Sequence, residues 1–301
     1  MTTVPRTLVA TVVSTAPVSA HLVRVTLDVD GFVSTDAPDE YVRLLIPPAG
    51  AELALPTIDE SWNVTYPEGA QEPTSRVYTI SDHRVVDGVP RVDVDIAVHE
   101  RGVGSDWVRR CVPGDRVGMV EPHGLYAAAP DCAWQLLVAD ITGLPALARI
   151  LRGLRAGQRA EVVAVVTDPA DRIDLPSAAD VEVTWIVADD ERHVSDLLSA
   201  AVCERELPGE DAPGGRYVWL AGEARANRAA RRHLRRELRW PQRDFYTCGY
   251  WQIDAERWHA RYAEVAETVG AQARKAYVEL SERDQGAYLD AVEDIYERAG
   301  L

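Results

Sequence analysis

The expected secondary structure changes character near Pro130, and this change restricts the possible folds more than any other feature of the sequence. Upstream of it, short runs rich in β-branched residues are separated by turn residues such as Asp87-Gly88. Within residues 91–98, apolar and acidic side chains alternate, which is the pattern of a half-buried strand. Short strands separated by turns predict an antiparallel β-barrel or sandwich. The expected strands are residues 8–13, 22–27, 41–46, 76–80 and 91–98, and residues 50–73 are expected to form a long surface loop.

Downstream of Pro130, strands are expected to alternate with helices, which predicts a doubly wound parallel sheet. Ligands bind such sheets beyond the carboxyl ends of the strands. The expected strands are residues 135–139, 162–166, 181–187, 217–221 and 245–250, and the expected helices are residues 144–154, 193–203 and 224–239.

Beyond Trp251 the chain is expected to be helical to its end, because Trp258, Tyr262, Val265 and Val269 recur at helical spacing. We expect this apolar stripe to pack on the second domain; a lid over the site or a dimer contact is the alternative. The predicted fold is therefore an N-terminal antiparallel β-barrel at 1–128, a doubly wound α/β domain at 129–254 and a helical C-terminal extension at 255–301.

Composition restricts the function further. The net charge of -16 opposes binding to nucleic acid or to anionic lipid, so small-molecule partners are expected. The sequence has no run of about 18 apolar residues and no signal-peptide core near its start, which favours a cytoplasmic protein without membrane insertion. The four cysteines are far apart and form no Cys-x-x-Cys pair. Reduced thiols are therefore expected, and no metal site.

Two segments of the first half carry residues suited to a flavin dinucleotide. Arg76-Val77-Tyr78-Thr79 offers a cation for a pyrophosphate, an aromatic ring for the flavin and a hydroxyl for its edge, and Arg76 and Tyr78 share one face of a strand. Glycines in the second segment, residues 98–107, allow backbone N–H groups to approach an anion at the start of a short helix near residues 107–111. Ser105 is expected to cap that helix.

Several motifs in order resemble the siderophore-interacting protein family, which are flavin-dependent ferric-siderophore reductases related to ferredoxin reductases. The resemblance extends over residues 7–252. The motifs are Arg76-x-Tyr78-Thr79, Asp95-x-x-x-His99, Gly102-x-x-Ser105-x-Trp107, Pro113-Gly114-Asp115, Pro122-x-Gly124, Asp140-Ile141-Thr142-Gly143-Leu144-Pro145-Ala146, Ala221-Gly222-Glu223-Ala224 and Gly249-Tyr250-Trp251.

The resemblance implies a role for each matching position. Arg76 would contact the FAD pyrophosphate, Tyr78 would lie along the isoalloxazine, and Thr79 would lie near its N5, with Ile80 beside it. His99 would contact the dinucleotide, and the backbone from Gly102 through Gly104 and Ser105 to Trp107 would surround the phosphates. The nicotinamide side would be lined by Thr142, Gly222, Glu223 and Trp251. No catalytic side chain beyond the flavin is implied.

Three positions depart from the family pattern, which has Arg, Glu and Arg where this chain has Ser81, Ile141 and Gln252. Residues 225–239 carry seven arginines, which are expected to form a solvated face balancing a very acidic protein. Arg225 or Arg228 could alternatively meet the 2′-phosphate of NADPH.

The function that we predict is FAD-dependent reduction of ferric siderophores or other ferric chelates by NADH or NADPH, in a monomer or weak dimer. Alternatives are a flavin reductase or diaphorase with another acceptor, and a flavin-binding protein without turnover. Hydrolase and kinase motifs are absent from the sequence.

Overall fold

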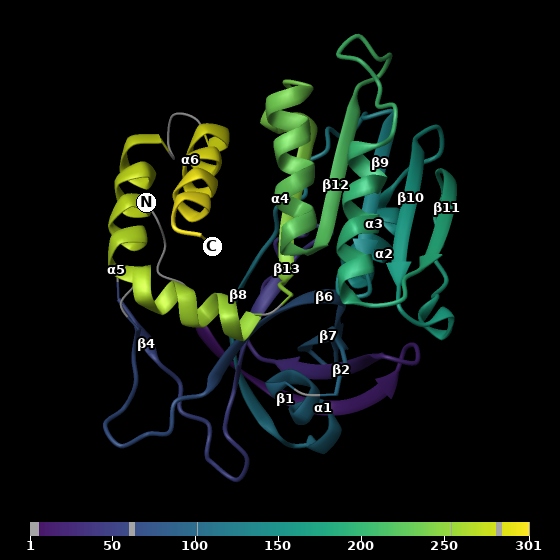
Figure 1. Ribbon diagram of the computed structural model, residues 1–301. Coiled ribbons are helices and arrows are strands. Elements are labelled where there is room, and N and C mark those ends of the chain that lie inside the picture. The colour runs from purple at the N-terminus through teal and green to yellow at the C-terminus, as the bar shows by residue number, and fades with distance from the viewer. Residues whose placement is uncertain (1–5, 60–63, 101, 254, 281–284, 301) are drawn as a thin grey trace.

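The N-terminal half is a closed antiparallel barrel of six strands, as predicted (Figure 1). The computed structural model describes residues 6–59, 64–100, 102–253, 255–280 and 285–300. Around the barrel the strand order is β1-β2-β7-β6-β3-β8. Their bounds are β1 Thr7–Pro17, β2 Leu22–Val29, β3 Tyr41–Ile46, β6 Thr74–Val86, β7 Val89–Ala97 and β8 Arg116–His123. One set of alternating side chains fills the barrel with a continuous apolar core.

Strand β8 closes the barrel by pairing with both β1 and β3, and it is missing from the predicted strands. Gly118 and Pro122 interrupt its pattern in the sequence. A Cβ at Gly118 would lie 2.9 Å from Leu45 Cβ and 2.9 Å from Leu55 Cδ2, so glycine is needed for close packing. Gly118 therefore weakens the strand pattern in the sequence, and the same residue allows β8 to pack against β3 and Leu55.

Two turns on this half differ in how well they could be predicted. Asp87 and Gly88 connect β6 to β7 with φ values of 51° and 82°, which is the tight hairpin turn expected of an Asp-Gly pair. The predicted loop at 50–73 instead contains a small hairpin, formed by β4 Thr57–Ile58 and β5 Val64–Thr65. Figure 1 shows this hairpin away from the barrel core.

The second half is a five-stranded parallel sheet in the order β11-β10-β9-β12-β13, which confirms the doubly wound prediction. The chain begins in the centre with β9, moves outward to β11, and returns to the other side with β12. The strands are β9 Trp134–Asp140, β10 Arg159–Val166, β11 Asp180–Val187, β12 Arg216–Glu223 and β13 Phe245–Trp251. The direction of winding reverses between β9 and β12, and their carboxyl ends are where such a sheet binds ligands.

Helices cover both faces of this sheet, so its central strands are buried on both sides. Helix α2, Leu144–Gly153, packs on one face, and helices α3, Glu191–Cys203, and α4, Ala224–Arg232, pack on the other. A π-helical turn, His233–Glu237, continues α4. The predicted helix 224–239 is therefore present, but its last part is wound more widely than an α-helix.

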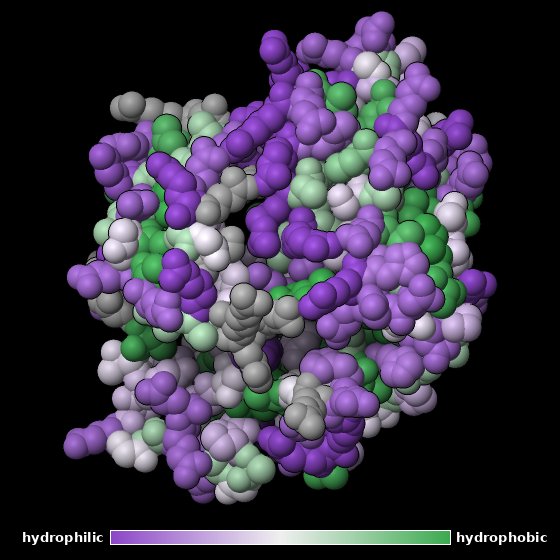
Figure 2. Space-filling model, viewed as in Figure 1, coloured by the Kyte–Doolittle hydropathy of each residue, from purple (hydrophilic) through white to green (hydrophobic). Residues whose placement is uncertain are grey.

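The C-terminal extension consists of α5, Ala255–Leu280, and α6, Gln285–Arg298, and its packing differs from the prediction. Val269, Ala276 and Ile295 form an apolar cluster with other residues of these two helices only. The apolar stripe is therefore covered by the extension itself. In Figure 1, α6 lies between α5 and α4, and Figure 2 shows hydrophilic side chains between the extension and α4.

The described residues contain no helix that is long and apolar enough to cross a membrane.

Candidate functional site

Arg76 and Tyr78 lie on β6 with their side chains on the same face, as the strand pattern predicts. Arg76 is exposed and donates a hydrogen bond to the Ser75 carbonyl at 2.8 Å. Tyr78 is half-buried against the barrel core. Burial raises the pKa of Tyr78 to about 12, although the charge of Arg76 lowers it slightly. Tyr78 is therefore a neutral aromatic ring with an exposed guanidinium beside it.

Helix α1, Val103–Arg110, begins beside Tyr78, and two glycines allow this approach. A Cβ at Gly104 would overlap the Tyr78 hydroxyl and lie 3.1 Å from Tyr78 Cζ. Gly102 has φ 144°, and a Cβ there would lie 2.7 Å from His99 Cε1. The first turn of α1 therefore presents bare backbone next to Tyr78 and His99, which is a geometry suited to a phosphate group.

Ser105 does not cap α1, contrary to the prediction. The N-cap position lies three residues earlier, at Gly102, and no side chain caps the helix. Ser105 lies inside the first turn, buried, and its Oγ accepts a hydrogen bond from the His99 backbone N–H at 3.1 Å. Trp107 is also buried, with its side chain in the barrel core. The side chain of Trp107 is therefore directed away from solvent. Arg101 lies outside the described residues.

Thr79 and Ile80 follow Tyr78 and differ sharply in their surroundings. Ile80 points into the barrel core, its N–H donates to the Glu40 carbonyl at 2.8 Å, and its carbonyl accepts from Arg149 at 2.9 Å. Ile80 therefore supports the strand. The Thr79 hydroxyl is buried and has no hydrogen-bond partner among the described residues. The Tyr250 phenol of β13 is near enough to interact with it electrostatically, but the geometry falls short of a hydrogen bond.

A buried polar group without a partner costs about 1–3 kcal/mol, so the Thr79 hydroxyl is a group that a ligand could satisfy. Together with the glycine turn on α1, it gives β6 and α1 two features that fit a flavin dinucleotide. Thr79 also links the two halves of the chain, because Tyr250 belongs to the parallel sheet.

The carboxyl ends of β9, β12 and β13 bring Thr142, Gly222, Glu223 and Trp251 together around Asp140. Asp140 Oδ1 accepts from the Thr142 backbone at 2.9 Å and from its hydroxyl at 2.6 Å. Asp140 Oδ2 accepts from the Trp251 indole N–H at 2.7 Å. Burial raises the pKa of the Asp140 carboxyl, while these donors act in the opposite direction.

Glu223 performs a structural task at this edge. Its Oε2 accepts from the Ala226 backbone at 3.0 Å, which caps α4, and from the Ser195 hydroxyl at 2.7 Å. Its Oε1 accepts from the Ile253 backbone at 3.4 Å. The side chain therefore ties α3, α4 and the end of β13 together. Asp140, which holds the whole edge, was not among the predicted site residues, although it begins one of the motifs.

The arginine-rich helix α4 is not simply a solvated face. Arg231 and Arg235 both donate to the Asp290 carboxylate of α6, at 2.8 and 3.1 Å, and Arg236 pairs with Asp294. These ion pairs attach the extension to the second half of the chain. Arg225 pairs with Asp196 of α3, while Arg228 is half-exposed.

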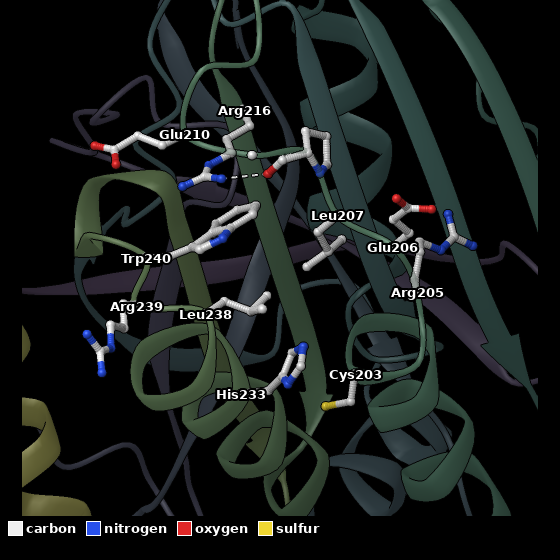
Figure 3. A pocket seen from close by; sticks show the side chains of 12 residues that line it. Cys203, Arg205, Glu206, Leu207, Glu210, Arg216, His233, Leu238, Arg239 and Trp240 are labelled. Atoms are coloured by element: carbon white, nitrogen blue, oxygen red, sulfur yellow. Dashed lines mark hydrogen bonds between the residues drawn. The ribbon is translucent and has the colours of Figure 1, made fainter.

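A groove of about 500 Å³ lies apart from these residues (Figure 3). It lies at the amino end of β12, between α3 and the π-helical turn. Two of its arginines are bound by the chain itself: Arg216 donates to the Pro208 carbonyl at 2.5 Å, pairs with Asp244 and stacks on Trp240, and Arg205 pairs with Glu161.

Two family models match the chain in succession. Residues 11–126 match the siderophore-interacting FAD-binding domain, and residues 132–254 match the siderophore-interacting protein model. An uncharacterized protein of Mycobacterium tuberculosis is 31% identical over 233 residues, which cover 71% of this chain and 78% of that protein. The chain belongs to the siderophore-interacting protein family.

Two other known proteins are similar to this siderophore-interacting protein. The NADPH-dependent ferric-chelate reductase of Escherichia coli is 29% identical over 248 residues, covering 80% of this chain and 91% of the reductase. The crystal structure of a siderophore utilization protein from T. fusca superposes with a TM-score of 0.66 and 25% identity, covering 84% of this chain and 95% of that protein.

Within this siderophore-interacting protein, Ser81 occupies a buried position beside two acidic residues. Its Oγ bonds Asp95 Oδ1 at 2.9 Å and the Asp93 carbonyl at 3.2 Å. Arg24 pairs with the same Asp95 at 2.7 Å. Position 81 therefore belongs to a polar cluster on the barrel wall. Having serine there, where the family pattern has arginine, does not take a cation away from the face that carries Arg76 and Tyr78.

Proposed function

We propose that this protein reduces ferric siderophores or similar ferric chelates with electrons from NADH or NADPH, using FAD, and so releases Fe(II). The observation that carries the proposal is the joint between the two halves beside Thr79, where Arg149 and Arg152 of α2 donate to the carbonyls of Ile80 and Ser81 on β6, at 2.9 and 2.7 Å. Because of it, the strand suited to a flavin faces the edge of the parallel sheet where a nicotinamide is expected. The family match and the name of the similar Escherichia coli reductase support the same reaction.

On the flavin side, the exposed Arg76 guanidinium would pair with the pyrophosphate, and the neutral Tyr78 ring would lie along the isoalloxazine. The buried Thr79 hydroxyl would satisfy the ring edge near N5, with Ile80 keeping its strand in position. His99 and the backbone of Gly102, Gly104, Ser105 and Trp107 would surround the phosphates. Bound FAD would supply the redox chemistry, taking a hydride from the nicotinamide and passing electrons singly to Fe(III).

On the nicotinamide side, we propose that Thr142, Gly222 and Trp251 contact the dinucleotide and that Glu223 holds the edge on which they lie. Arg228 in the middle of α4 is our candidate for a 2′-phosphate, since Arg225 already pairs with Asp196. The polypeptide has no acid–base step to perform in this scheme, because electron transfer to a ferric chelate needs positioning and exclusion of water.

The test is anaerobic addition of NADPH or NADH to the FAD-loaded protein, followed by a ferric chelate. We expect the visible flavin absorbance to disappear when the nicotinamide is added and to return when the ferric chelate is added. The absorbance of an Fe(II)-specific chelating dye should increase at the same time. Reoxidation by a quinone but not by ferric chelates would favour the diaphorase alternative. Failure of both nicotinamides to bleach the flavin would favour a binding protein without turnover, and a protein that cannot bind FAD would refute all three.

An Arg76→Gln variant should weaken FAD binding about tenfold or more, because a charge-assisted bond to phosphate is worth about 1.5–3 kcal/mol. Arg159→Gln is the matched control, since Arg159 is exposed and lies at the amino end of β10. Equal FAD affinity in the two variants would contradict the assignment of Arg76.

We further propose that the functional units are residues 1–128, 129–254 and 255–301. The barrel ending at His123, the sheet between Trp134 and Trp251, and the separate apolar cluster of the extension support this division. A cytoplasmic location is supported by four cysteines that are all free thiols. The scattered positions of the exposed apolar side chains support a monomer or weak dimer, which sedimentation analysis would test.

A further inference from the structure

Asp140 lies at the centre of the sheet edge, and its carboxylate is almost completely buried, with 1% of the residue exposed. It ends β9, which is separated from β13 by β12. The Trp251 indole of β13 nevertheless reaches the Asp140 carboxylate, at 2.7 Å between Nε1 and Oδ2. The hydrogen bond therefore spans the end of the intervening strand.

Gly222 is the residue of β12 that permits this bridge. A Cβ at position 222 would lie 2.8 Å from Asp140 Cγ and closer still to Oδ2, the oxygen that accepts the indole N–H. It would also lie 3.0 Å from Leu198 Cδ1. The glycine of the Ala221-Gly222-Glu223 motif thus has a purpose within the chain itself, because any side chain there would displace the carboxylate from Trp251.

The other oxygen of the carboxylate organises the loop after β9. Asp140 Oδ1 accepts from the Thr142 backbone and hydroxyl, and the Asp140 carbonyl accepts from the Gly143 N–H at 3.0 Å. One carboxylate therefore fixes Thr142 and Trp251 at the same time. These are two of the residues that we propose as contacts of the nicotinamide dinucleotide.

We propose that Asp140 is a positioning residue for the nicotinamide dinucleotide: it holds the Trp251 indole over Gly222 and the Thr142 turn in one fixed arrangement, and so orders the surface on which the dinucleotide binds. This inference rests on the proposed function, since it takes the dinucleotide to bind at this edge. It assigns to Asp140 no contact with the dinucleotide, only control of two residues that make contact.

The informative change is Asp140→Asn, which preserves shape. An asparagine has one acceptor oxygen and one NH2 donor group in place of two acceptor oxygens. In one orientation the amide oxygen accepts from the Thr142 N–H, and the NH2 group then faces the Trp251 indole N–H. In the other orientation the oxygen accepts from the indole, and the NH2 group faces the Thr142 N–H. Either orientation leaves one N–H without an acceptor. Asp171→Asn is the matched control, because the buried Asp171 carboxylate binds Ser19 and His21 and makes no hydrogen bond to Thr142 or Trp251.

Binding of NADP+ and NAD+ to the FAD-loaded protein avoids dependence on turnover. In Asp140→Asn we expect the affinity for the better of the two to fall about tenfold, which corresponds to one lost hydrogen bond, with FAD affinity unchanged. Asp171→Asn should bind as the wild type does. Trp251→Phe should also weaken binding, and Asp140→Asn in that background should weaken it by less than threefold further, because the two residues act through one bond.

A spectroscopic readout tests the bond directly. The indole N–H resonance that disappears in Trp251→Phe identifies Trp251, and in the wild type it should lie downfield and exchange slowly with solvent. It should move upfield in Asp140→Asn. This measurement on the wild type stands even if Asp140→Asn fails to fold, and a fast-exchanging, unshifted resonance would overturn the proposal.

Failure of nicotinamide binding at this edge and failure of the positioning role of Asp140 would give different results. If the wild type binds neither NADP+ nor NAD+, the proposed function is wrong and the role of Asp140 falls with it. If the wild type binds and Asp140→Asn binds equally well, only the role of Asp140 is wrong. Strictly additive effects of the Asp140 and Trp251 variants would likewise refute the bridge as the means of action.

Discussion

Replacing Gly104 with alanine should disturb flavin binding through a single contact. The new Cβ would overlap the Tyr78 hydroxyl and lie 3.1 Å from Tyr78 Cζ. The hydroxyl must move out of this overlap, which takes the ring out of its preferred rotamer or shifts α1. Such overpacking costs about 1–3 kcal/mol.

A compensating gain must be subtracted. Alanine is favoured over glycine within a helix by about 1 kcal/mol, and Gly104 lies inside the first turn of α1. The net loss of unfolding free energy is therefore expected to be about 0–2 kcal/mol. FAD affinity should fall more, by about tenfold to a hundredfold, because the displaced Tyr78 ring and the displaced backbone are both proposed contacts.

The assay is chemical denaturation of the apoprotein together with FAD titration followed by flavin fluorescence. Gly153→Ala in α2 is the control, since a Cβ there meets nothing within 4 Å. Tyr78→Phe combined with Gly104→Ala removes the clashing hydroxyl, so FAD affinity should return to that of Tyr78→Phe alone. A Gly104→Ala variant with wild-type FAD affinity, or a double variant as weak as Gly104→Ala, would refute the reasoning.

Three further predictions concern other parts of the chain. Asp290→Asn should weaken the attachment of the C-terminal extension by a free energy of about 1–3 kcal/mol, because Arg231 and Arg235 lose their shared carboxylate. Limited proteolysis should then cut α6 at least tenfold faster. The control Glu279→Gln breaks an exposed pair with Lys275 and should not change the rate of cleavage. Ser81→Ala should lower the unfolding free energy by about 1 kcal/mol and leave the KM for the nicotinamide unchanged, because Ser81 bonds Asp95 on the barrel wall; a raised KM would contradict that location. Tyr78 should titrate near pH 12 in a phenolate difference spectrum against Tyr78→Phe. Its pKa in the folded state lies above the unfolded value near 10, so its contribution to the free energy of unfolding is on the order of 2 kcal/mol. That contribution should be complete below pH 10 and be lost as the pH rises through 12.

The barrel, the parallel sheet and most element positions could be predicted, because alternation and strand–helix order depend on local pattern. What could not be predicted depends on contacts between distant segments. Strand β8 contains Gly118 for the sake of Leu45 and Leu55, which no local pattern reveals. The start of α1 was misplaced because Ser105, a good capping residue, is used instead to bind the His99 backbone.

The candidate site shows the same division. Arg76, Tyr78 and the glycines could be chosen from residue chemistry, because a cation, an aromatic ring and bare backbone are what a dinucleotide requires. Asp140 was overlooked, since its importance arises only when β12 places Gly222 between it and Trp251. The extension was also misjudged, because an apolar stripe at helical spacing does not state which surface will cover it.

Helix α2 holds the barrel through backbone atoms of β6, and this has a consequence for how the family can vary. Arg149 and Arg152 donate to the carbonyls of Ile80 and Ser81, at 2.9 and 2.7 Å, on the residues that directly follow Thr79. Carbonyl groups are present whatever side chain a position carries. A different side chain at position 81 can therefore alter the local charge of the barrel wall while both of these hydrogen bonds stay in place, so variation at this position need not dismantle the joint between the two halves.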